Sequence, residues 1–148
     1  MIALIQRVRE AAVRVDGQVT GSIGPGLLIL LGIHRHDTAR ELDWLVGKCA
    51  RLRIFRDEEG RMNRSVQDVG GGVLVVSQFT LYGDASRGNR PSYIEAAPPE
   101  VAEPLYERFV ATLGDTLGHA VATGVFGAMM DVHLINDGPV TLWLERRP

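Results

Sequence analysis

The side chains best suited to chemistry fall in three short polar stretches of the sequence. Residues 77–81 (SQFTL) follow the apolar run 73–76, where the end of a buried strand would open onto a cleft. Residues 87–92 (RGNRPS) carry two guanidinium groups, whose geometry matches phosphate and carboxylate oxygens. Residues 136–141 (NDGPVT) contain Gly138-Pro139, a bond type that is cis in about 5–6% of cases and would then form a rigid edge of carbonyl acceptors. Taken singly, each stretch also has a plain structural interpretation, as a strand end, a solvated loop and a hairpin turn.

Conventional acid–base and nucleophilic arrangements are absent from the sequence. Thr80 is the obvious hydroxyl nucleophile, but no base is visible beside it, so we expect a positioning role and keep a covalent role as the alternative. His34 and His36 would share one face of a strand, where zinc could bind, but no further ligands lie nearby in the sequence. Neither a metal nor another cofactor is therefore predicted. Cys49 is the only cysteine, which excludes an internal disulfide.

Length and charge limit the class of protein. The 148 residues include 16 Lys and Arg and 18 Asp and Glu, a formal net charge of −2, and fit a single domain over residues 1–148. This charge predicts no broad nucleic-acid face and no DNA partner. The longest apolar run, residues 26–33, is far shorter than the roughly 20 residues that span a bilayer, so no membrane partner is expected. With no secretory signal at the start, the sequence predicts a cytoplasmic protein.

Short strands must position the polar stretches, because 17 glycines punctuate the apolar runs. Asp16-Gly17 is a strong hairpin signal. The continuously apolar residues 27–33 are typical of a buried central strand. The aperiodic residues 82–93 are expected to form a loop. The strands that we expect are 1–9, 12–15, 18–23, 27–33, 53–55, 73–76, 121–123, 132–136 and 140–145.

Two helices are expected to cover this sheet. The first begins at a capping box formed by Thr38 and Glu41, with Asp37 as a rival cap. Its buried stripe comprises Leu42, Leu45, Val46, Cys49 and Leu52, which makes Cys49 a core residue. The second helix opens at Pro98-Pro99, and Val101, Leu105, Phe109 and Leu113 step by four along it. The prediction is one α+β domain with a curved, mostly antiparallel sheet and two main helices.

Taken together, the motifs resemble the D-aminoacyl-tRNA deacylase family almost from end to end. The resemblance is carried by residues 77–81 and 136–141, in this order and with the loop 88–92 between them. Further matching stretches are residues 1–3, 6–8, 15–17, 23–27 and 124–128. A sister family that edits other misacylated tRNAs is similar at the second motif but differs at the first. The sequence departs from the family pattern at Tyr93, where Phe is usual, and at Met129, where an acidic residue is frequent.

The resemblance implies hydrolysis of the ester that joins a D-amino acid, or glycine, to the 3′ end of tRNA. It also implies a barrel-like sheet and a homodimer. In the family the dipeptide equivalent to Gly138-Pro139 is cis and reaches into the partner's active site. The partners expected from it are therefore D-aminoacyl-tRNA, glycyl-tRNA and a second copy of the chain.

Roles for individual residues follow from this resemblance and from ester chemistry. The backbone N–H groups of Phe79 and Thr80 would stabilise the oxyanion, as the catalytic pair, while the ribose 2′-OH assists water. Ser77 and Gln78 would fix the motif and the ribose. Phe126 and Met130 would pack against the terminal adenine.

Chiral selection would depend on main-chain atoms at the second motif. The carbonyl groups of Gly138 and Pro139 would leave room only for hydrogen at the Cα of the amino acid and so exclude L-amino acids. Two alternatives stay open at this stage. One is the sister activity on L-alanyl-tRNA, and the other is a non-catalytic tRNA-binding dimer module.

Overall fold

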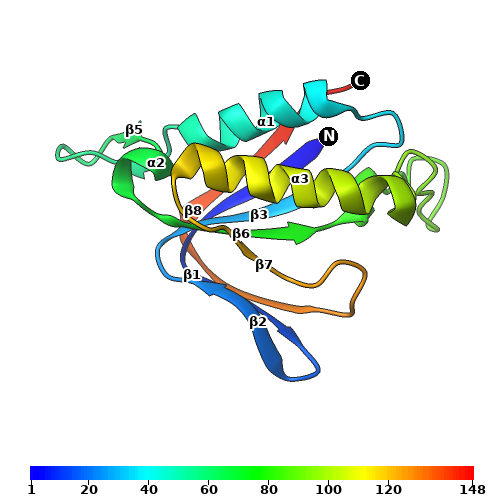
Figure 1. Cartoon of the computed structure of the whole chain (residues 1–148), viewed down its shortest axis with the longest axis horizontal. Helices are drawn as coiled ribbons and strands as arrows, with labels where there is room; N and C mark the ends of the chain where they lie inside the picture. Colours follow the sequence, from blue (N-terminus) through cyan, green and yellow to red (C-terminus); the bar gives the residue numbers. More distant parts are fainter.

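One long strand, β1 (Ile2–Val15), organises the sheet in the computed structural model, which describes residues 1–148 (Figure 1). Strand β8 (Asp131–Glu145) runs antiparallel along nearly its whole length. The other edge of β1 is divided between two antiparallel partners. Strand β3 (Gly26–Gly32) pairs with the first half, and β2 (Gln18–Ile23) pairs with the second half.

The sheet curls until its ends nearly meet. Strand β6 (Gly72–Ser77) lies parallel to β3, and the short β7 (Ala122–Thr123) lies parallel to β6, which gives the order β2-β1-β3-β6-β7 with β8 on β1. The pairing of β1 with β8 shifts register between Gln6 and Glu10, where bulges let the strands bend. Gly21 of β2 then approaches the carbonyl of Thr123 in β7. The predicted α+β fold with a barrel-like sheet is confirmed.

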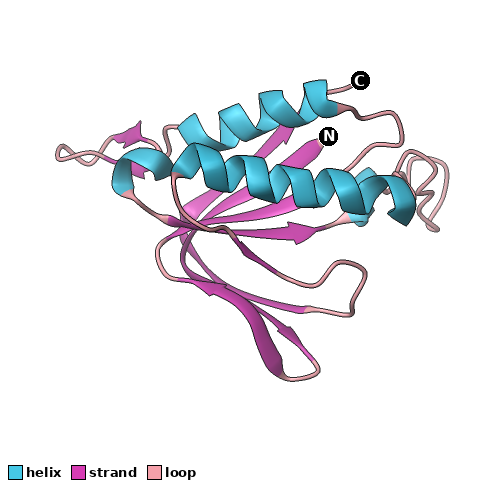
Figure 2. Cartoon of the chain, viewed as in Figure 1, coloured by secondary structure: helices cyan, strands magenta, loops and turns pink.

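The helices lie on one face of this sheet. Figure 2 shows α1 (Ala39–Arg51) and α3 (Pro99–Leu117) side by side over the strands. The remaining elements are α2 (Val66–Val69), the 3₁₀ turn η1 (Phe79–Tyr82), and the hairpin of β4 (Phe55–Arg56) and β5 (Met62–Arg64). Neither long helix has the length and apolar character that crossing a bilayer would require.

Two groups of buried apolar side chains hold the layers together. The larger, of 21 residues, fills the space between the sheet and the helices and includes Ile29, Leu45 and Phe109. The smaller, inside the curl of the sheet, comprises Val8, Ala11, Val13, Leu28, Leu74 and Val76. Since β6 contributes to both groups, its carboxyl end, where the first polar stretch begins, is firmly positioned.

The predicted first helix is confirmed in its cap and in four of the five residues of its stripe; the fifth, Leu52, follows the last helical residue and is half-buried. Thr38 and Glu41 form the capping box, with the Thr38 N–H donating to the Glu41 carboxylate at 2.8 Å. Asp37 is not the cap, because its carboxylate accepts hydrogen bonds from the N-terminal amine and from the His34 N–H. Cys49 is buried, and this burial raises the pKa of its thiol to about 12, so the thiol has no thiolate character near neutral pH.

Several predicted element boundaries are wrong. The segments 1–9 and 12–15 form one strand, β1, and the segments 132–136 and 140–145 form one strand, β8. The strand expected at 53–55 lies at Phe55–Arg56. Helix α2 was not predicted. In α3 Val101 is exposed, and the buried positions are Ala102, Tyr106, Phe109 and Leu113.

Tyr106 fixes α3 to the strand that carries the first polar stretch. Its hydroxyl donates to the Val75 carbonyl of β6 at 2.8 Å, and burial raises the pKa of this hydroxyl to about 12. Its ring also lies 5.8 Å from the ring of Phe126, centroid to centroid. One side chain therefore joins the helix, the strand and the loop before β8.

Replacing Tyr106 with Phe removes this hydrogen bond but keeps the ring. We expect the free energy of unfolding to fall by about 1–2 kcal/mol, because a buried hydrogen bond is lost. Urea denaturation measures the change. Tyr93→Phe is the matched control, since Tyr93 is 40% exposed, and we expect a change within about 0.5 kcal/mol. Equal losses in the two variants would contradict the role given to Tyr106.

Candidate active site

A cavity of about 680 Å³ opens where β6 ends. Three segments form its walls: residues 76–79, the segment 96–99 with Tyr93 before and Ala102 after it, and the loop 126–130. Most of the lining side chains are apolar, and none is an Asp, Glu, His, Lys or Arg. The cavity thus offers surface for rings and aliphatic groups but no side chain that could act as a conventional acid or base near neutral pH.

The turn η1 forms the wall that carries the first polar stretch. Gln78, just before η1, is held by its N–H, which donates to the Leu31 carbonyl of β3 at 2.8 Å. The turn can lie this close to β3 because residue 32 is glycine; a Cβ there would stand 3.1 Å from Leu81 Cβ and 3.3 Å from the Gln78 carbonyl oxygen. The position of η1 is therefore set by the central strand.

Two backbone donors in η1 lack a partner in the chain. The N–H groups of Leu81 and Gly83 donate to the carbonyls of Gln78 and Thr80, whereas those of Phe79 and Thr80 make no hydrogen bond. The Thr80 hydroxyl accepts a hydrogen bond from the Gln78 amide and makes none with an ionisable side chain. Two adjacent free N–H groups can bind an anionic oxygen.

The predicted site residues of the first motif come together at this cavity. Ser77, Gln78 and Phe79 line it, and so do Phe126 and Met130 from the loop before β8. Thr80 does not line the cavity and is exposed. The lining residues that were not assigned a site role from sequence include Tyr93, whose ring meets the Phe79 ring edge-on at 5.2 Å, and Met129, which is 92% exposed.

Gly138 and Pro139 lie elsewhere in the same chain. They sit within β8, are exposed, and do not line this cavity; the peptide bond between them is cis. Residue 138 must be glycine, because a Cβ there would lie 2.3 Å from the Val140 nitrogen. Residues 137–140 have no paired residue on β1 and form an excursion of β8. Asn136 spans this excursion, since its side chain accepts from the Val140 N–H at 3.0 Å and donates to the Val140 carbonyl at 3.1 Å.

Arg7 of β1 also holds this excursion, and sequence reasoning did not select Arg7 as a functional residue. Its side chain is 3% exposed; Nε donates to the Asp137 carbonyl at 2.9 Å and Nη1 donates to the Ile54 carbonyl at 2.5 Å. The Asp137 carboxylate lies 3.4 Å from the same guanidinium. An arginine at an otherwise apolar position of a core strand was the available signal, because such a charge is buried only when paired.

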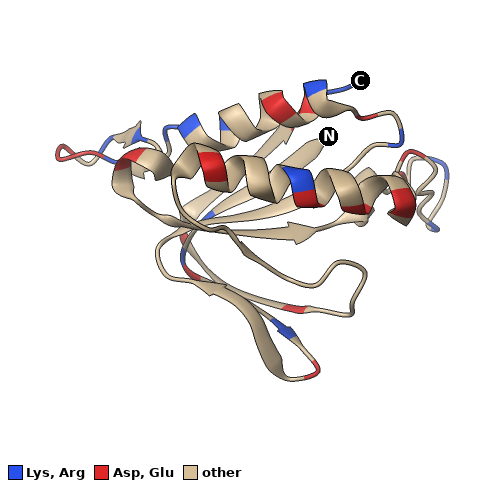
Figure 3. Cartoon of the chain, in the orientation of Figure 1, with Lys and Arg blue, Asp and Glu red and all other residues tan.

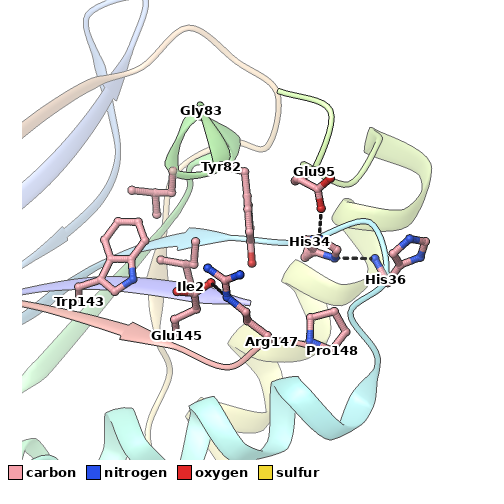
Figure 4. A pocket seen from close by; sticks show the side chains of 11 residues that line it. Ile2, His34, His36, Tyr82, Gly83, Glu95, Trp143, Glu145, Arg147 and Pro148 are labelled. Carbon is pink, nitrogen blue, oxygen red and sulfur yellow. Dashed lines mark hydrogen bonds and ion pairs between the residues drawn. The ribbon is translucent and has the colours of Figure 1, made fainter. Parts of the chain in front are cut away.

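The ionisable side chains gather instead at a second, neighbouring cavity of about 470 Å³ (Figure 4). The His34 ring lies 2.6 Å from the Glu95 carboxylate and accepts the His36 N–H, and the Arg147 and Glu145 side chains face each other on the opposite wall. The hydrogen bond from His34 lowers the pKa of Glu95. The His34–Glu95 side-chain pair and the β-bridge between the His34 and Ala96 backbones together hold the segment before α3.

The middle polar stretch, residues 87–92, lies outside both cavities. It is exposed throughout and is closed by the paired backbones of Asp84 and Ser92. No ion pair joins Arg87 or Arg90 to a carboxylate of the chain. Neither arginine contributes to the walls of the apolar cavity.

The chain is similar to known proteins over its full length. Residues 4–145 match the family model described as D-Tyr-tRNA(Tyr) deacylase. A protein of Salinibacter ruber named D-aminoacyl-tRNA deacylase is 63% identical over 147 residues, which is 99% of this chain and 98% of that protein. One of Dinoroseobacter shibae with the same name is 63% identical over 145 residues, 98% of this chain and 99% of that one.

Solved structures share the fold. A structure titled "c-Myc DNA Unwinding Element Binding Protein" superposes with a TM-score of 0.94 at 43% identity and covers 100% of both chains. A structure described as a probable eukaryotic D-amino acid tRNA deacylase superposes with a TM-score of 0.83 over 97% of both chains. Its identity of 18% makes it a likeness of fold.

Replacing Arg7 with Met tests how the excursion of β8 is held. We expect the free energy of unfolding to fall by about 2–3 kcal/mol, because the buried Ile54 carbonyl and the partly buried carbonyl and carboxylate of Asp137 lose a partner. Arg9→Met is the matched control, since Arg9 faces the same carboxylate at 3.8 Å but is 74% exposed, and should cost less than about 0.5 kcal/mol. Identical denaturation curves for the two variants would refute this role of Arg7.

Proposed function

Because the chain belongs to the D-Tyr-tRNA(Tyr) deacylase family and is a D-aminoacyl-tRNA deacylase, we propose that main-chain atoms perform both its catalysis and its chiral selection. The Phe79 and Thr80 N–H groups stabilise the reacting ester, and the Gly138 and Pro139 carbonyls exclude L-amino acids. The observation that carries the catalytic part is the pair of unpartnered N–H groups beside a cavity without ionisable side chains.

Ester hydrolysis places a negative charge on the former carbonyl oxygen. Donors that are fixed before the reaction stabilise this charge, and removing one such donor typically costs about 2.7–4 kcal/mol. The aminoacyl ester is already activated, and the neighbouring ribose 2′-OH assists the attacking water. The protein then needs to hold the ester in reactive geometry rather than supply a base. Ser77 and Gln78 fix the ribose, and Phe126 and Met130 pack against the terminal adenine.

Chiral selection needs a steric barrier, because D and L esters offer the same groups for binding. Carbonyl oxygens at the Cα leave room for hydrogen but not for a side chain. A D-amino acid presents hydrogen there, and so does glycine, so both D-aminoacyl-tRNA and glycyl-tRNA are substrates. The rigidity of the segment supports this role, since Arg7 and Asn136 hold it from two sides.

The two halves of the mechanism come from different subunits in our proposal. Gly138 and Pro139 are exposed and stand apart from the cavity of their own chain. In a homodimer they enter the cavity of the partner, so that each site combines the N–H groups of one copy with the carbonyls of the other. The single domain acts in the cytoplasm, where aminoacyl-tRNAs are made. With a net charge of −2, we do not propose DNA as a partner.

A release assay with matched esters tests the proposal. We expect hydrolysis of D-tyrosyl-tRNA and glycyl-tRNA and no hydrolysis of L-tyrosyl-tRNA above the rate without protein. Equal cleavage of the two enantiomers would contradict the carbonyl barrier. Cleavage of L-alanine from a mismatched tRNA, without cleavage of the D-ester, would favour the sister activity. Binding of tRNA with no release from any ester would favour a non-catalytic module.

The variant Phe79→Pro tests the backbone donors. Proline removes one N–H yet suits the first position of a helical turn, so the turn should be kept. We expect kcat for D-tyrosyl-tRNA to fall by about 10²–10³-fold. Phe79→Ala and Thr80→Ala keep both N–H groups and should retain most of kcat. A loss beyond about a thousandfold in Thr80→Ala would instead indicate that its hydroxyl takes part in the chemistry.

A further inference from the structure

Three guanidinium groups converge on a single carboxylate beside Gly138. The Asp137 carboxylate lies 3.4 Å from Arg7, 3.8 Å from Arg9 and 3.8 Å from Arg56. These arginines come from β1 and from β4, two elements far apart in the sequence. The result is a local surplus of two positive charges on a chain whose net charge is −2.

Only one of the three guanidinium groups makes hydrogen bonds within the chain. Arg7 is buried and donates to the carbonyls of Asp137 and Ile54. The side chains of Arg9 and Arg56 are 74% and 55% exposed, and their contacts with Asp137 are too long for hydrogen bonds. The carboxylate that follows Arg9 in the chain, Glu10, already faces His133 at 3.2 Å. Arg9 and Arg56 therefore keep most of their donors free.

Their positions relative to Gly138 are nevertheless fixed. Arg7 joins the Ile54 carbonyl, two residues before Arg56, to the Asp137 carbonyl, one residue before Gly138. Arg9 follows two residues after Arg7 on β1, at the bulge opposite this part of β8. Both free guanidinium groups thus stand beside the excursion of β8. Figure 3 shows both basic and acidic residues along the helices and loops of the chain.

We propose that Arg9 and Arg56 bind phosphates of the 3′ strand of the tRNA whose aminoacyl end lies in the partner's cavity. This inference rests on the proposed function, in which Gly138 and Pro139 enter that cavity. In this proposal the ribose–phosphate strand of the substrate leaves the partner's cavity past residues 137–139 and so passes Arg9 and Arg56. Guanidinium groups with free donors match phosphate oxygens, because two parallel N–H groups can bind one phosphate.

The proposal separates the two halves of the substrate. Phosphate contacts position a nucleic acid without reading its sequence, and they make its binding depend on salt. The adenosine and the amino acid interact with the cavity, whereas the strand before the adenosine interacts with Arg9 and Arg56 of the other copy. Loss of the arginines should therefore weaken the use of tRNA but not the use of an ester that has no phosphate.

Paired substrates test this separation. Arg9→Gln, Arg56→Gln and the double variant are assayed with D-tyrosyl-tRNA and with the D-tyrosyl ester of adenosine, in salt between about 50 and 200 mM. We expect kcat/KM for the tRNA to fall about five- to tenfold for each arginine, with the adenosine ester unchanged within about twofold. In the double variant the slope of log kcat/KM against log salt should become shallower by about 1.4, or 0.7 for each single-strand phosphate contact.

Two further variants complete the test. Arg108→Gln, on the exposed side of α3, is the matched control and should change neither substrate nor slope. The pair Arg9→Lys and Arg56→Lys keeps the charge and should restore most of the salt dependence. Equal losses on both substrates would overturn the proposal, because the arginines would then act through Gly138 and Pro139. An unchanged salt slope would also overturn it.

The ratio of D to L cleavage separates this inference from the proposed function. If the unaltered protein cleaves the D- and L-tyrosyl esters of adenosine equally, the proposed carbonyl barrier is wrong. If it cleaves only the D-ester and the double variant keeps the full salt slope with tRNA, only the phosphate contact is wrong.

Discussion

The hydrogen bonds of the buried Arg7 guanidinium are the interactions on which the position of residues 137–139 depends most. Arg7 lies in β1, the strand that pairs with β2, β3 and β8. Its guanidinium donates to the backbone carbonyls of residues 54 and 137. A charge buried in this way is tolerated only with its hydrogen bonds complete. The fold therefore cannot shift the excursion of β8, or the start of the β4–β5 hairpin, without leaving that charge unpaired. The main-chain carbonyls of Gly138 and Pro139 gain a fixed position in consequence.

In the proposed mechanism, a fixed main chain also accounts for hydrolysis at a cavity that has no ionisable side chains. Side chains that act as acids or bases must be matched in pKa to their task, whereas backbone N–H and C=O groups have constant polarity and need only be aimed. Here β3 aims η1 through the bond between Gln78 and Leu31, and Arg7 and Asn136 aim residues 138 and 139. In the proposal, the N–H groups of η1 stabilise the negative charge on the reacting ester, and the carbonyls of residues 138 and 139 exclude L-amino acids. Both depend on rigidity, which the two buried clusters of the fold supply.

Sequence reasoning identified most of the strands and the first helix, because apolar runs and capping residues are local signals. The five residues of the cavity wall that it named came from the family resemblance and from ester chemistry. Sequence reasoning divided β1 and β8 at polar residues. Each strand continues past its irregular segment because β1 and β8 pair with each other on both sides of it, and this pairing is not visible in either segment alone. Sequence reasoning chose Val101 in α3 because steps of four drift by about 40° each around a helix, whereas the buried positions alternate steps of four and three. The four-residue helix α2 is too short for a periodic signal, although its capping box, Ser65 with Asp68, was present in the sequence. The carbonyl partners of Arg7 at residues 54 and 137, and the separation of Gly138 from the cavity of its own chain, are tertiary facts that no local pattern contains.

The central claim is that each site joins the N–H groups of one copy to the carbonyls of the other, and a mixed dimer tests it most directly. One subunit carries Phe79→Pro with residues 138 and 139 intact, and the other keeps its N–H groups but lacks residues 138 and 139, a deletion of two that preserves the alternation of β8. Purified mixed dimers should have one working site, which receives its barrier from the other subunit and cleaves D-tyrosyl-tRNA but not L-tyrosyl-tRNA. Cleavage of both enantiomers by the mixed dimer would mean that the barrier belongs to the same chain as the N–H groups, and would contradict the account.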